Sequence, residues 1–142
     1  MWLVEVYEID RTNSGSKLVN ISTRSLVRSA AEVQIAGFVI SGSAPKPVII
    51  RASGPALTQY GVPGVLADPK IELYSGSSSI AQNDNWGAPL RTEFLRLGLD
   101  NRSVGSNDAA FSVTLDPGAY TVIVSGKSSA SGVALVEVFE KN

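Results

Sequence analysis

The chain of 142 residues contains neither cysteine nor histidine. Without cysteine it can form no disulfide and perform no thiol chemistry. Without histidine it lacks the side chain that most often serves as a general base and as a metal ligand. No motif of a known catalytic site compensates for these absences, so the sequence predicts a protein that is not an enzyme.

Charge is also scarce. Charged residues make up 18% of the chain, and 12 basic against 13 acidic residues leave a net charge of −1. The two signs are interspersed, so no basic face for nucleic acid is expected. No apolar run approaches the roughly 20 residues that span a bilayer, which argues against membrane insertion. We find no signal peptide at the start, but the cysteine-free, Ser- and Gly-rich composition is compatible with an extracellular or cell-surface location.

What the chain does contain is β-branched residues in alternating patterns, separated by turns rich in Gly, Pro, Asn and Ser. This pattern predicts an all-β protein, an antiparallel, jelly-roll-like β-sandwich of about eight or nine strands. Strands are expected at residues 3–8, 17–23, 31–40, 47–53, 69–74, 79–82, 109–115, 119–126 and 133–140.

Two short helical turns are expected in the irregular parts of the chain. One lies at residues 55–58, and the other at 89–97, where Leu90, Phe94 and Leu97 share a face. Within the strands, alternation predicts which side chains point into the core. The expected inward sets are Val33, Ile35 and Val39, then Phe111, Val113 and Leu115, then Tyr120, Val122 and Val124.

The hexapeptide LVEVYE at residues 3–8 returns as LVEVFE at residues 135–140. The second copy completes the last predicted hairpin, so the first is surplus to the domain. We therefore divide the chain into a surplus strand at 1–9, equivalent to the last strand of a preceding repeat, a linker at 10–16 and one β-sandwich at 17–142. The expected donor residues are Leu3, Val4, Val6 and Tyr7, which correspond to Leu135, Val136, Val138 and Phe139.

Several longer motifs add a resemblance that covers nearly the whole chain from Leu18 onward. They are LVNISTR at 18–24, IAGFVISG at 35–42, IRASGPAL at 50–57, NDNW at 83–86, PGAYT at 117–121 and GVALVEV at 132–138. Together they resemble a β-rich tandem repeat of large bacterial surface or secreted proteins, although residues 25–30 depart from its pattern. Residues 70–140 are also similar to the pre-peptidase C-terminal type of β-sandwich beside secreted bacterial enzymes. The resemblance implies a non-catalytic extracellular module.

Three groups of residues are candidates for a site. Asn83, Asp84, Asn85 and Asp108 offer oxygen ligands for calcium, or they close loops by Asx-type hydrogen bonds. Trp86 either stacks on a sugar or plugs one end of the sandwich. Arg51 alternates with Ile49 on a strand, so we expect a buried ion pair with Asp68 or Glu72. No cofactor other than this calcium candidate is predicted.

The duplicated strand leads to a functional hypothesis. If the fold has one slot for this strand, the extra copy exposes an apolar edge unless a neighbour accepts it. Such a contact is heterologous and produces filaments or rings. The sequence thus predicts a structural module whose partners are other copies of itself or adjacent repeats, head-to-tail. Alternatively, both copies fit at two edges of one domain. A second hypothesis is an accessory domain that binds glycan or cell wall.

Overall fold

The computed structural model describes residues 20–29, 32–99 and 106–141. The duplicated strand at 3–8, with its donor residues Leu3, Val4, Val6 and Tyr7, lies outside the described residues, as does the linker at 10–16. The division of the chain into strand, linker and domain therefore stays a prediction. No helix among the described residues has the length and apolar character needed to cross a membrane.

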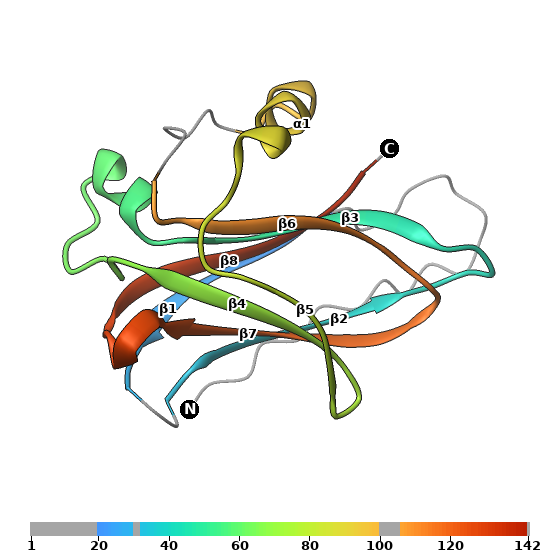
Figure 1. Ribbon diagram of the computed structural model, residues 1–142, viewed down its shortest axis with the longest axis horizontal. Helices are drawn as coiled ribbons and strands as arrows, with labels where there is room; N and C mark the ends of the chain where they lie inside the picture. The colour runs from blue at the N-terminus through green and yellow to red at the C-terminus, as the bar shows by residue number, and fades with distance from the viewer. Residues whose placement is uncertain (1–19, 30–31, 100–105, 142) are drawn as a thin grey trace.

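The described residues form an antiparallel β-sandwich, which confirms the predicted fold class (Figure 1). The first sheet has the order β1-β8-β3-β6 and the second the order β2-β7-β4-β5. The eight strands are β1 (Asn20–Val27), β2 (Gln34–Ile40), β3 (Lys46–Ser53), β4 (Pro69–Ser75), β5 (Ser78–Asn83), β6 (Ala109–Leu115), β7 (Gly118–Gly126) and β8 (Gly132–Glu140).

The strand pairing follows one simple rule. β1 pairs with β8, β2 with β7, β3 with β6 and β4 with β5, so the chain is a long hairpin whose tip is the β4–β5 turn. Alternate pairs of this hairpin belong to opposite sheets. A long hairpin wrapped in this way is the jelly-roll arrangement of two packed antiparallel sheets. As a consequence, the first and last strands lie side by side.

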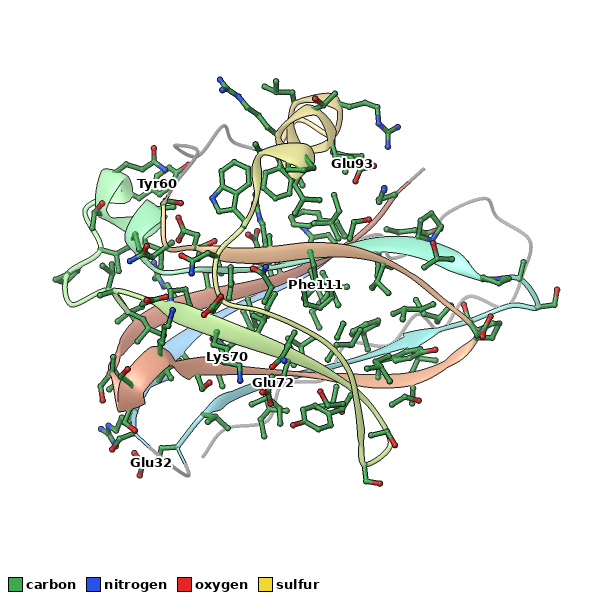
Figure 2. The ribbon with its side chains drawn as sticks, viewed as in Figure 1. Glu32, Tyr60, Lys70, Glu72, Glu93 and Phe111 are labelled. Carbon is green, nitrogen blue, oxygen red and sulfur yellow. The ribbon has the colours of Figure 1, made fainter. Side chains whose placement is uncertain are left out.

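The main core lies between the two sheets. Its fully buried members include Ile50, Ile71, Leu73, Val122 and Val124. Phe111 projects into the space between the layers and packs against this core (Figure 2). Full burial of each such side chain contributes about 1.5–3 kcal/mol. Two of the predicted inward faces, those of residues 111–115 and 120–124, are thus confirmed.

The predicted inward face of β2 is wrong. Ile35 and Val39 point outward and are 58% and 70% exposed, whereas Ala36 and Ile40 are buried. The pairing of β2 with β7 places Phe38 opposite Tyr120, and their rings stack at 5.6 Å on the inner side. Because side chains alternate along a strand, the inward position of Phe38 determines which face each other residue of β2 takes. The stacking of Phe38 on Tyr120 therefore turns Ile35 and Val39 outward.

Short helical segments cover one end and the outer face of the first sheet. They are η1 (Pro55–Tyr60), η2 (Ala88–Leu90), α1 (Arg91–Arg96) and η3 (Lys127–Ser129). Figure 1 shows α1 on the side of the first sheet that faces away from the second. Phe94 of α1 is buried there on Ile49, Ala110 and Trp86, with Leu90 and Leu97 packed around it. This confirms the predicted helical face.

Candidate functional site

The outer face of the first sheet carries a row of polar residues across three of its four strands, β1, β8 and β3. The register places Ser22 opposite Glu137, and Glu137 opposite Arg51. All three side chains point away from the sandwich core, because residues at paired positions share a face of the sheet. The row therefore forms the base of the concave surface described below.

At the centre of the row, Arg51 and Glu137 form a buried ion pair. Arg51 Nε donates to Glu137 Oε2 over 2.5 Å, and the two side chains are 8% and 9% exposed. The Arg51 guanidinium also lies 4.9 Å from the centre of the Phe139 ring. The predicted partners Asp68 and Glu72 were wrong: Asp68 lies near Lys127, and Glu72 bonds to Lys70 and Tyr74 on the second sheet. A buried guanidinium requires a carboxylate close by, and strand register supplies Glu137.

Above this floor the surface is hollowed. The η1 hollow, as we call it, has a volume of about 480 Å³ and is bordered by η1 and the segment after it. Tyr60 stands at the rim on η1 and is 61% exposed (Figure 2). The Nη1 atom of Arg51 is closed to solvent and has no hydrogen-bond partner among the described residues. The lining residues are Ser22, Arg24, Arg51, Leu57, Tyr60, Val62, Leu135 and Glu137.

The residues predicted as calcium ligands form hydrogen bonds to different partners. Asp108 is 2% exposed, and its Oδ1 accepts the backbone N–H groups of Gly54 and Ala56. Its Oδ2 accepts the hydroxyl of Ser106, which in turn accepts Trp86 Nε1–H. These bonds tie the start of β6 to η1 and to the loop before α1, so the position of Asp108 fits a structural role.

The other calcium candidates engage different partners. Asn83 accepts the backbone N–H of Ala110 and donates to the Asn85 carbonyl, while Asp84 lies 2.9 Å from Lys127 Nζ. The hydrogen bond from Lys127 holds the pKa of Asp84 below its ordinary value. The described residues hold no group of three or more acidic side chains suited to a metal ion. Calcium binding stays a prediction, and the arrangement agrees with the Asx-type alternative.

Trp86 is buried, but on the outer face of the first sheet with Phe94 of α1, Ile49 and Ala110, and not at one end of the sandwich as predicted. It is 4% exposed, and its ring lies 5.2 Å from that of Phe94. Its indole N–H reaches Ser106, which satisfies the one polar group of the ring. Little of the ring is open to stack on a sugar, so Tyr60 takes its place as the exposed aromatic beside a concave surface.

The second copy of the duplicated strand forms most of β8, the middle of the three strands beneath the hollow. Val136 and Val138 of β8 point into the core and are 1% and 6% exposed. Leu135 and Phe139 lie on the outer face with Glu137, and Leu135 lines the hollow. The sequence predicted these positions as equivalents of residues 3–8, but alternation alone does not predict that they contribute to a hollow. The central Glu of both copies was the available signal, since a carboxylate in an apolar strand requires a partner.

The comparisons with known proteins bear on the fold. No protein-family model matches the chain, and no curated protein sequence matches it. The pre-peptidase C-terminal domain of a collagenase from Bacillus anthracis has a similar solved structure. The TM-score is 0.53 at 13% sequence identity, and the match covers 84% of this chain and 89% of that one. This likeness supports the β-sandwich fold and agrees with the resemblance of residues 70–140 to that type of domain.

Proposed function

We propose that this chain is a non-catalytic module of an extracellular bacterial protein and associates head-to-tail, in a filament or tandem array, through the duplicated strand. The sequence supports the absence of catalysis, since it contains no histidine or cysteine. The pre-peptidase C-terminal domain of a collagenase, which shares the fold, supports a role as an attached module.

One observation carries the assembly proposal: the contacts that hold β8 depend on residues that the first copy repeats. Val136 and Val138 fill the core, and Glu137 neutralises Arg51 beside Phe139. Residues 3–8 offer valine at both core positions, glutamate at the paired position and tyrosine in place of phenylalanine. A strand of this sequence therefore suits the same slot between β1 and β3 of a neighbouring unit once that unit's own β8 is exchanged out of it.

The test is the size of the particles in solution. Light scattering and electron microscopy of the full chain are expected to show concentration-dependent assembly, which deletion of residues 1–9 abolishes. Glu5→Arg is expected to act like the deletion, because it places a cation against Arg51 of the acceptor. Asp10→Arg makes the same change of charge in the predicted linker and should leave assembly intact. A full chain that stays a compact monomer at all concentrations overturns the proposal.

A second candidate function is an accessory domain that binds carbohydrate or cell wall beside a secreted enzyme. The η1 hollow favours it, because binding sites are concave surfaces with a few convergent polar groups. Because Tyr60 lines the hollow and Trp86 does not, Tyr60 is the residue to vary in a binding screen. The Tyr60→Ala variant is expected to lose retention on a glycan resin. The Trp86→Ala variant tests only how tightly α1 packs on the first sheet.

A further inference from the structure

The η1 hollow differs from the rest of the outer sheet surface in shape. Side chains of η1 and the residues after it rise beside the strands and enclose about 480 Å³, within the range of small-molecule sites. Leu57 is 4% exposed and fixes η1 to the sheet, while Tyr60 keeps most of its ring open. The wall is therefore preformed, and its aromatic member is accessible.

The charge of the hollow is positive. Glu137 is neutralised by Arg51, so these two side chains cancel. Arg24, on β1 at the edge of the sheet, is exposed and has no ion pair among the described residues. One uncompensated guanidinium in a concave surface attracts an anion, and its planar fork suits a carboxylate in particular.

The base of the hollow is formed by the Arg51–Glu137 ion pair. Arg51 Nη1 is shut away from water, so it is closed to a ligand in the hollow as well. Next to this pair, Ser22 adds a hydroxyl, which lies 3.5 Å from Glu137 Oε1. The polar groups thus gather on the side of β1 and β3.

The remaining lining is apolar. Leu57, Val62 and the Tyr60 ring belong to η1 and the segment after it, and Leu135 lies on β8 beside Arg24. A pyranose ring has the matching character, since its C–H face packs on an aromatic side chain while its oxygens are hydrogen-bonded at the edge. A peptide strand would instead need free backbone partners; β8 and β3 are paired on both sides, whereas β1 is the edge strand, so an acidic peptide is one of the probes below.

From shape, charge and polarity together, we propose that the η1 hollow binds a uronate unit of an acidic polysaccharide. Arg24 holds the carboxylate, Tyr60 packs against the sugar ring, and the Ser22 hydroxyl accepts a hydrogen bond from a sugar hydroxyl. This inference rests on the second candidate function, the accessory binding domain, and is independent of head-to-tail assembly.

The experiment is titration calorimetry of the full chain with three probes: tetragalacturonate, the neutral cellotetraose and hexaglutamate. Binding is expected for tetragalacturonate alone, and it should weaken with added salt. Arg24→Gln and Tyr60→Ala should each reduce the affinity by about tenfold or more, as for the loss of one charge-assisted contact. Arg28→Gln removes a charge just beyond the end of β1, outside the hollow, and should bind as the wild type does.

Each other outcome overturns the inference. Equal affinity for cellotetraose rules out recognition of the carboxylate, and a preference for hexaglutamate assigns the hollow to an acidic peptide. Absence of binding to all three probes removes the site. Light scattering on the same samples reports assembly separately, so a chain that assembles without binding, or binds without assembling, shows which proposal has failed. Arg24 and Tyr60 are exposed, so their variants should unfold at wild-type urea concentrations.

Discussion

At the scale of single residues, the most consequential pair is Arg51 with Glu137. Both side chains are more than nine-tenths buried, and they join the neighbouring strands β3 and β8. Desolvation makes such a pair expensive to form, and removal of one partner leaves the other charge stranded. The pair therefore acts as a constraint: β8 can occupy its slot only in the register that brings Glu137 to Arg51.

The first residue-scale prediction concerns this pair. Glu137→Leu is expected to lower the free energy of unfolding by about 3–5 kcal/mol, because Arg51 is left buried and unpaired. Combining it with Arg51→Met should restore most of the loss. Urea unfolding of the two single variants and the double variant measures both effects.

A control for this cycle is available in the same chain. Arg28 and Glu32 form an ion pair with side chains 60% and 63% exposed. Glu32→Gln should therefore change the free energy of unfolding by less than about 1 kcal/mol. If Glu137→Leu is no more costly than Glu32→Gln, then the buried pair does not constrain the strand.

The second residue-scale prediction concerns pH. Lys70, and then Tyr74, hydrogen-bond to Glu72 and hold its pKa below the ordinary value. A depressed carboxyl pKa adds stability at neutral pH, and this stability is lost as the pH falls below about 4.3 toward the folded pKa. Glu72→Gln should thus be less stable than the wild type at pH 7, by less than about 1 kcal/mol. The difference should shrink as the pH falls below about 4.3 toward the folded pKa of Glu72. A difference that does not shrink in this range would contradict this origin.

At the scale of elements, the start of β8 depends on a close crossing of two backbones. Residues 64–66 run parallel to the start of β8, where Leu66 N–H donates to the Val133 carbonyl and Val133 N–H to that of Gly64. Gly132 sits beneath this crossing, and a Cβ atom there would lie 2.5 Å from the backbone nitrogen of Leu66. The link from η1 to β4 can reach the sheet only because this position has no side chain.

The element-scale prediction follows from this crossing. Gly132→Ala should lower the free energy of unfolding by about 1–3 kcal/mol or more, since backbone atoms must move to accept the methyl group. Gly37→Ala in β2 is the matched control, because the closest contact of its added Cβ is the Tyr120 carbonyl oxygen at 3.9 Å. Thermal unfolding of the two variants compares them directly. Equal stability would mean that the crossing is not closely packed.

At the scale of the whole molecule, the wrapped hairpin brings the last strand beside the first. β8 pairs with β1 along eight positions, from Val27 opposite Gly132 to Asn20 opposite Phe139. The repeated hexapeptide precedes β1 in the chain by a short segment. In the proposed head-to-tail assembly, residues 3–8 of one unit would take the place of β8 beside β1 of a neighbour. The particle-size measurements on the deletion and on Glu5→Arg test this arrangement at the same scale.

Much of the architecture could be predicted because the alternation of apolar and polar residues along a strand can be recognised from a short segment of sequence. The strands predicted from residue 31 onward and the helical face of Leu90, Phe94 and Leu97 depend on neighbouring residues, and the structure confirms them. The strand predicted at 17–23 instead forms β1 at Asn20–Val27, and the one predicted at 3–8 lies outside the described residues. The face of β2 was wrong, because Phe38 and Ile35 lie on opposite sides of one strand and both are apolar. Only the stacking of Phe38 on Tyr120 decides between them.

The sequence by itself determined the all-β class, the order of the elements and the duplicated strand, all of which are set by local pattern or by identity of residues. Only the tertiary structure decided the partner of Arg51, the burial of Trp86 and the gathering of Arg24, Tyr60 and Ser22 around one hollow. These depend on which strands become neighbours when a long hairpin wraps into two sheets. Contacts between residues 86 positions apart, as in Arg51 and Glu137, are products of that wrapping.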